Sequence, residues 1–321
     1  MSALHKKFPG VEVGGSSSMK SSNIGGQAVM EGVMMRNADK YAVAVRKTDG
    51  EIVVKTEEYK GIVQNKKIRS LPIIRGVFSF IDSMVLGMST LTYSASFFMD
   101  EEEEEKDEKK ESVMMGLMIA CSVVMAVAIF MILPYFLSQL FRKFTDSTTL
   151  ITLLEGAVRL VIFFGYILLI SRMKDIQRVF MYHGAEHKCI NCIEHGMELN
   201  VENVLKSSRL HKRCGTSFLF IVMIVSIIFF LFIRIESPIW RVVFRLLLIP
   251  VIAGVSFEFI RLAGKSENKL VIFLSKPGMM LQKLTTREPD ASMAEVAIAS
   301  VEAVFDWRAY LKENFGWQEK V

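Results

Sequence analysis

The sequence predicts an α-helical multipass membrane protein with about four spanning helices and one interfacial or re-entrant helix. A small N-terminal β-rich cytoplasmic domain and a cytoplasmic helical hairpin complete the predicted fold. The 321-residue chain is 51% hydrophobic and only 23% charged, which is too apolar for an ordinary soluble domain. Its apolar residues form long runs, and its basic residues alternate in number between the segments that flank those runs.

Two uncharged runs predict spanning helices most directly. Residues 113–141 carry no charge and exceed the roughly 20 residues that cross a hydrocarbon core, and residues 216–233 are equally apolar. Residues 150–171 and 242–260 predict two further spans, although each contains charged side chains. The chain thus places its first two spans within 113–171 and its last two within 216–260.

The charges inside these spans have a structural interpretation. Glu155 and Arg159 are four residues apart with the acid first, so they share one helix face and can neutralise each other inside the bundle. Residues 242–260 contain Arg245 and Glu258. An ion pair such as Glu155–Arg159 can hold helices together and does not by itself indicate a catalytic role.

The distribution of lysine and arginine predicts the orientation. Segments 1–112, 142–149, 172–215, 234–241 and 261–321 contain 16, 2, 8, 2 and 9 basic residues. Basic loops stay in the cytoplasm, so we expect a multipass protein of the cell membrane with both termini and residues 172–215 cytoplasmic. Thiols are kept reduced there, which makes cysteines in this segment possible metal ligands rather than disulfide partners.

Composition divides the rest of the chain. Residues 1–24 are rich in Gly and Ser and are expected to be disordered, and residues 25–70 contain the hairpin pattern "YAVAVRKTDGEIVVK" of a β-rich domain. Residues 71–99 are apolar but hold Arg75 and Asp82, so they predict the interfacial or re-entrant helix. Residues 100–112 form an acidic linker, and residues 261–321 a cytoplasmic helical tail with an N-cap at Asp290.

The segment 172–215 concentrates the residues that carry chemistry. His183 and His187 are four apart on a stripe that continues from the apolar face of the preceding helix, so both imidazoles point inward. Glu186 completes the pattern His-x-x-Glu-His, which resembles the inverzincin metalloprotease signature. In that signature the histidines bind zinc and the glutamate acts on water.

A rival set combines Cys189 and Cys192 with His211 and Cys214, in the spacing of a closed structural zinc site. The turn signal near residue 197 predicts two antiparallel helices. In such a hairpin His183 faces the neighbourhood of His211 and Cys189 does not. We therefore favour zinc ligation by His183, His187, His211 and Cys214.

Several longer motifs resemble one known family, the YqhQ-like bacterial multipass membrane proteins. The motifs are "GGQAVMEGVMMR", "AVAVRKTDGEIVVK", "RGVFSFIDSMVLGM", "YHGAEHK", "HKRCGTSF" and "LTTREPDASMAEVAIA". Members are commonly labelled metal-dependent enzymes, and the resemblance implies the same site residues, His183, Glu186, His187, His211 and Cys214. The chain departs from the family pattern at Cys189, where Thr is usual, and at Lys212, where Pro is usual.

Two functions follow from this reading. In the first, the protein is a membrane-embedded metal-dependent hydrolase with zinc at the cytoplasmic membrane surface and Glu186 as general base. In the second, it is a non-catalytic membrane scaffold or accessory factor, in which zinc only stabilises the hairpin. The expected partners are the lipid bilayer and, for a scaffold, other membrane proteins; no feature predicts binding to nucleic acid. A transporter is less favoured, because the spans hold few ionisable residues and no inverted repeat is visible.

Overall fold

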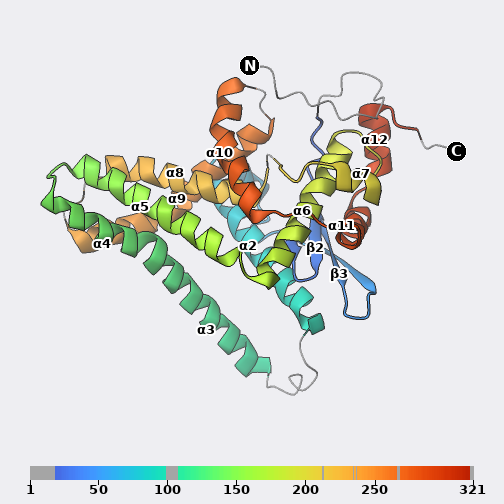
Figure 1. Ribbon diagram of the computed structural model, residues 1–321, viewed down its shortest axis with the longest axis horizontal. Coiled ribbons are helices and arrows are strands. Elements are labelled where there is room, and N and C mark those ends of the chain that lie inside the picture. Colours follow the sequence, from blue (N-terminus) through green and yellow to red (C-terminus); the bar gives the residue numbers. More distant parts are fainter. Residues whose placement is uncertain are drawn as a thin grey trace.

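The computed structural model describes residues 19–98, 108–211, 213–233, 235, 237–265 and 268–318. A small sheet and the helices around it form one part of the molecule, and a group of long helices extends from it (Figure 1). The predicted disordered segment 1–24 lies outside the described residues up to residue 18, as do residue 99 and most of the predicted acidic linker 100–112, up to residue 107. Lys212 also lies outside them.

The N-terminal sheet is a four-stranded antiparallel meander with strand order β1-β2-β3-β4. Its strands are β1 (Gly25–Val29), β2 (Gly32–Asn37), β3 (Lys40–Arg46) and β4 (Ile52–Glu58). Alternate residues of a strand face opposite sides, and both faces of this sheet are covered. Val33 and Met35 face one hydrophobic cluster, while Met34 faces the other. This confirms the small N-terminal β-rich unit.

Helices cover the two faces of the sheet. Helix α2 (Ile74–Ala95) lies on one face, where Leu86 and Tyr93 pack against the strands. Helices α6 (Lys174–Glu194) and α11 (Ala291–Val304) cover the other face. The apolar stripe that predicted an amphipathic helix after Asp290 is therefore buried, and Asp290 accepts the N-cap hydrogen bond from Met293 N at 2.9 Å.

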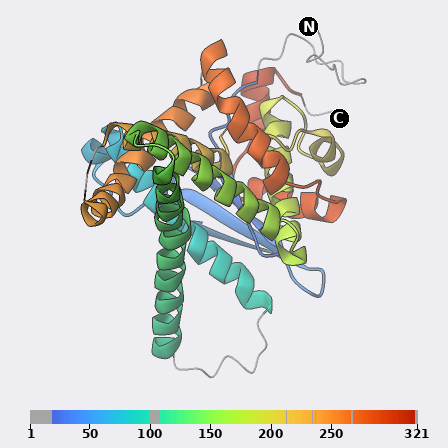
Figure 2. The ribbon, with the colours of Figure 1, turned by 60° about the vertical axis from the view of Figure 1, so that its left-hand side comes forward.

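The remaining helices complete the chain. They are α1 (Lys66–Ser70), η1 (Ser96–Phe98), α3 (Glu108–Val127), η3 (Ala128–Ile132), α4 (Leu133–Gln139), η4 (Leu140–Lys143), α5 (Thr148–Ile170), α7 (Val201–Lys206), α8 (Gly215–Phe232), α9 (Pro238–Lys265), α10 (Lys269–Thr285) and α12 (Trp307–Phe315). Pro134 has no N–H to donate, and the π-helical turn η3 immediately precedes it. Helices α3 and α4 thereby continue as one rod, whose α3 part projects from the rest of the molecule in Figure 2 while α4 packs on α5.

Within the described residues, five helical stretches are long and apolar enough to cross a membrane. Four of them are 116–143, 148–170, 215–232 and 239–264, in the regions where the sequence predicted spans. The fifth is 74–98, the segment predicted to be interfacial or re-entrant. The chain thus has the length and hydropathy pattern of a membrane protein.

Three buried charges of α5 and α9 form one network. Arg159 donates to Glu155 Oε1 at 2.9 Å, and Arg245 donates to both oxygens of Glu155 at 2.6 and 2.8 Å. The sequence spacing predicted the first pair, and the fold adds the second from α9. Two guanidinium groups that share one buried carboxylate join α5 to α9, and removal of that carboxylate would cost roughly 3 to 5 kcal/mol.

The predicted helical hairpin is present as α6 and the short helix α7. Gly196 has φ +78°, a left-handed conformation suited to glycine, where the chain turns. Asn200 caps α7 by accepting a hydrogen bond from Asn203 N at 2.9 Å. Helix α7 ends at Lys206, and α8 begins at Gly215 with Cys214 as its N-cap.

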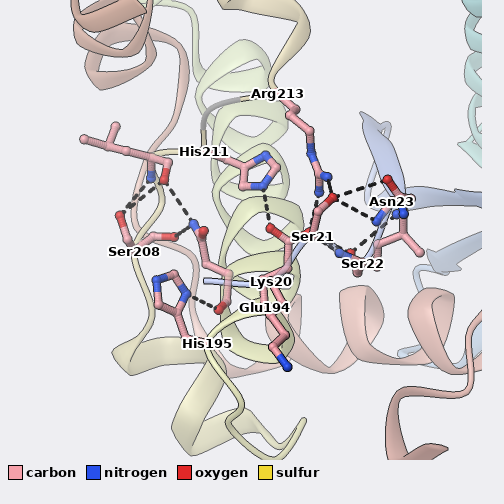
Figure 3. Close-up of polar contacts among 12 residues, drawn as sticks. Lys20, Ser21, Ser22, Asn23, Glu194, His195, Ser208, His211 and Arg213 are labelled. Carbon is pink, nitrogen blue, oxygen red and sulfur yellow. Dashed lines mark hydrogen bonds and ion pairs between the residues drawn. The ribbon is translucent and has the colours of Figure 1, made fainter. Parts of the chain in front are cut away.

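Glu194, at the end of α6, binds residues from two other segments of the chain, one near the N-terminus and one before α8 (Figure 3). Its carboxylate accepts hydrogen bonds from Ser22 N at 2.7 Å and Ser22 Oγ at 2.8 Å, contacts His211 Nε2 at 3.3 Å and pairs with Arg213. Residues 19–24, expected to be disordered, are instead ordered by these contacts. Burial by itself would raise the pKa of Glu194, but the donors from His211, Arg213 and Ser22 lower it to about 2.

Glu194→Gln is expected to destabilise the protein by roughly 3 kcal/mol at neutral pH, because the change leaves Arg213 without its buried counter-charge. The folded pKa is depressed, so the stabilisation is fully present above the ordinary pKa of 4.5 and declines as the pH falls towards about 2. Thermal unfolding of both proteins in detergent across this pH range measures the difference. Glu313→Gln on the exposed side of α12 is the control, and a wild-type advantage that grows below pH 4.5 would contradict the assignment.

Candidate metal centre

Three potential ligands converge from two parts of the chain. His183 and His187 lie one turn apart on α6, and Cys214 is the N-cap residue of α8. One ligand atom of each lies within 4.8 Å of the other two. Across the described residues, no other group of three or more His, Cys, Asp or Glu side chains is arranged to hold a metal ion.

A glycine lets the ligand helix approach its neighbour. A Cβ on Gly184 would lie 2.0 Å from Arg287 O, so only glycine fits at this position. Arg287 N in turn donates to Phe180 O at 2.8 Å. The segment that follows α10 is thereby held against α6, beside His183.

Backbone carbonyls fix which ring nitrogen of each of the two histidines carries the proton. His183 Nδ1 lies 2.9 Å from Thr285 O, and His187 Nδ1 lies 2.6 Å from Arg209 O. A carbonyl oxygen can only accept, so each Nδ1 carries a proton, and whenever the ring is neutral its lone pair lies on Nε2. Metal-binding histidines are commonly oriented by such a bond from the other ring nitrogen.

The two Nε2 atoms face the third ligand. His183 Nε2 lies 3.2 Å from Cys214 Sγ. His187 Nε2 is buried and has no hydrogen-bond partner among the described residues. A buried polar atom without a partner is costly, and a metal ion between these atoms would remove that cost.

The electrostatic environment favours a thiolate at Cys214. Burial alone would raise the pKa of the thiol, but His183 and His187 outweigh it and hold the pKa well below its ordinary value. Thr216 N also donates to the sulfur at 3.4 Å, at the start of α8. Burial alone would lower the pKa of His183, but Cys214 and Glu186 raise it to about 9. The thiolate is the form of cysteine that binds metals.

Glu186 lies beside the cluster and is 5% exposed. Its Oε2 is 3.9 Å from His183 Nε2, and within the described part of the chain its carboxylate accepts no hydrogen bond. Gly26 of β1 approaches it so closely that a Cβ there would lie 2.9 Å from Glu186 Cγ. The sheet therefore confines the side chain that the sequence predicted as the general base.

The cluster and Glu186 line a cavity of about 550 Å³. Strand β1 and helix α6 form one side, and α2, α8 and α9 supply mostly apolar walls. The volume lies in the range of small-molecule sites. His183, Glu186, His187 and Cys214 are all accessible from this space.

His211 stands apart from the other predicted ligands. Its ring centroid is 5.8 Å from that of His187, but its Nε2 is directed at the Glu194 carboxylate, as Figure 3 shows. Its backbone N donates to Gln282 Oε1 at 2.8 Å. In this arrangement His211 helps to fix the segment that leads to Cys214.

The rival ligand set is not brought together. Cys189 and Cys192 are fully buried in the hydrophobic cluster between α6 and α11. Burial raises the pKa of both thiols, that of Cys192 to about 12. Both side chains act as small apolar core residues.

Several residues that build the site were not predicted from the sequence. Glu194 holds His211, and the carbonyls of Arg209 and Thr285 orient the two histidines. The Ser22–Glu194 contact spans 172 residues, which no local spacing reveals. Every residue type has the same backbone carbonyl, so the sequence does not indicate which carbonyl will orient a histidine.

Comparison with known proteins places these features in a family. The pattern of the family described as protein of unknown function DUF1385 matches residues 71–307. The uncharacterized protein YqhQ of Bacillus subtilis (strain 168) is 36% identical over 301 residues, which cover 90% of this chain and 94% of that protein. No solved structure matches the chain. The chain therefore belongs to the DUF1385 family, together with proteins similar to YqhQ.

Proposed function

We propose that this protein is a membrane-embedded, zinc-dependent hydrolase whose site lies at the cytoplasmic membrane surface. The observation that carries the proposal is the three-ligand cluster of His183, His187 and Cys214 at the wall of a cavity, with the Glu186 carboxylate beside it, 3.9 Å from His183 Nε2. Structural zinc sites use four protein ligands, whereas catalytic sites use three and keep one position open. The contact of His211 with Glu194 supports the three-ligand arrangement.

The residues present suit zinc. Two imidazole nitrogens and one thiolate are ligands that zinc accepts in catalytic sites. When bound there, zinc would act as a Lewis acid that polarises a substrate and makes a water molecule more acidic. The carbonyls of Thr285 and Arg209 would hold the proton of each imidazole on Nδ1 and turn Nε2 towards the ion.

Glu186 would accept the proton from the attacking water and return it to the leaving group. Its carboxylate is buried, faces the cavity and is not committed to another donor among the described residues. A general base must lie within reach of the water it deprotonates, and Glu186 is next to the ligand His187 in sequence and near His183 in space.

A metal-stabilised scaffold is the second candidate. The cluster joins α6 to the start of α8, and the last turn of α10 is bonded to His183, so an ion there would also hold these parts together. Residues 116–143 have no buried residue in their most apolar stretch. That surface is available to lipid or to other membrane proteins, as a scaffold or accessory factor requires.

The packing also supports four crossings with α2 at the interface. The sheet contacts α6 and α11, so all three belong on one side of the membrane. Between β4 and α6 the chain forms α2, the α3–α4 rod and α5, and only an even number of crossings returns it to that side. Helix α2 packs on the sheet through Leu86 and Tyr93, which makes it the best candidate for the helix that does not cross.

The orientation is testable with cysteine probes in a cysteine-free background. Glu198→Cys is expected to be labelled only after the cells are opened, and Asp146→Cys from outside intact cells, because basic segments stay in the cytoplasm. A reporter fused after residue 321 should report cytoplasm. Labelling of residue 198 from outside intact cells would overturn this topology.

Purified protein is expected to hold about one zinc per chain. His183→Ala, His187→Ala and Cys214→Ser should each remove it, whereas His211→Ala should retain it. His195→Ala is the matched control, because its Nδ1 is also bonded to a backbone carbonyl, that of Asn191, outside the cluster. Elemental analysis measures the metal, and zinc retained by the His183→Ala, His187→Ala double mutant rules the site out.

Glu186→Gln separates the enzyme from the scaffold. The change keeps the size of the side chain but removes the group that accepts a proton, so metal content and protein level should persist while function is lost. Function is measured as rescue of the phenotype of cells that lack the gene, with Glu202→Gln on α7 as the control. Full rescue by metal-loaded Glu186→Gln would refute the hydrolase and leave the scaffold.

A further inference from the structure

The cavity beside the cluster is lined by both polar and apolar side chains. The polar ones include His183, Glu186, His187, Cys214, Arg213 and Thr216. The apolar walls come from three of the helices that are long and apolar enough to cross a membrane, through Phe80 and Met84 of α2, Phe218 and Leu219 of α8, and Phe257 and Ile260 of α9. A ligand that contacts both kinds of side chain must itself be amphipathic.

The apolar walls reach the outer surface of these helices. Met84 is 53% exposed and Leu219 is 45% exposed, and both line the cavity. Leu219 lies in the first turns of α8, close to where that helix would enter the bilayer. Phe80 and Phe218 meet across α2 and α8 with ring centroids 5.4 Å apart. The apolar walls of the cavity therefore include side chains that would face lipid.

We propose that the cavity binds one bilayer glycerophospholipid, with an acyl chain between α2, α8 and α9 and the headgroup region at His183, Glu186 and Cys214. A volume of about 550 Å³ suits part of one lipid rather than a folded protein. The role of this lipid as a substrate rests on the proposed hydrolase function, but its binding does not.

Photo-cross-linking tests the binding directly. The full-length protein is reconstituted in vesicles of phosphatidylethanolamine and phosphatidylglycerol, a fraction of which carries a diazirine in the acyl chain, and labelled residues are mapped by mass spectrometry. Label is expected at Phe218 and Phe257 inside the cavity as well as at the outward-facing Leu169 and Leu247. Label confined to outward-facing residues overturns the proposal.

Two variants that fill the cavity make the test specific. Ser79→Trp and Ser83→Trp each place a bulky ring among the lining residues of α2 and should abolish label at Phe218 and Phe257. Ser89→Trp, on the same helix but outside the cavity, should leave it unchanged. If Ser79→Trp and Ser83→Trp both fold well and leave the label at Phe218 and Phe257 unchanged, the proposal of a bound acyl chain is refuted. It is also refuted if Ser89→Trp loses as much of this label as the two filling variants.

Cavity label in the wild-type protein, compared with rescue by Glu186→Gln, separates this proposal from the hydrolase. Cavity label in the wild-type protein together with normal rescue by metal-loaded Glu186→Gln would retain the lipid site and discard the enzyme. Absence of cavity label in the wild-type protein together with failed rescue by Glu186→Gln would discard the lipid and retain the enzyme.

Discussion

The close contact between Gly184 and the carbonyl of Arg287 governs the arrangement of the candidate site. No side chain fits between these two backbones, so α6 lies directly against the segment that follows α10. That separation puts Thr285 O at hydrogen-bonding distance from His183 Nδ1. The bond leaves Nε2 free and turned towards Cys214, and the geometry of the ligands thus depends on a backbone contact.

The Glu194 carboxylate is the second constraint on the site. It binds Ser22 near the N-terminus and the segment of His211 and Arg213 before α8. This contact holds the segment next to Cys214, which lines the cavity, and occupies the histidine that would otherwise be a fourth ligand. A three-ligand cluster next to a carboxylate is the arrangement expected of a catalytic site rather than a closed structural one.

Buried charge is handled differently in the two halves of the molecule. In the long helices, Glu155 is satisfied by Arg159 and Arg245, which is a structural solution to the cost of charge in an apolar environment. At the cavity, His187 Nε2 and the Glu186 carboxylate lack hydrogen-bond partners among the described residues. Polar groups left unsatisfied at a cavity wall are better explained by a ligand than by stability.

The sequence by itself determined the features that depend on near neighbours in the chain. Hydropathy located the long apolar helices, alternation and a turn signal located the sheet, and spacing placed His183 and His187 on one face of a helix. The cap at Asp290 was also predicted, because a cap bonds only two or three residues away. Only the tertiary structure decided that Cys214 joins the two histidines while His211 turns to Glu194, and that α2 packs on the sheet. The physical reason is that these contacts join residues far apart in sequence, and several of them end on backbone carbonyls that every residue type carries alike.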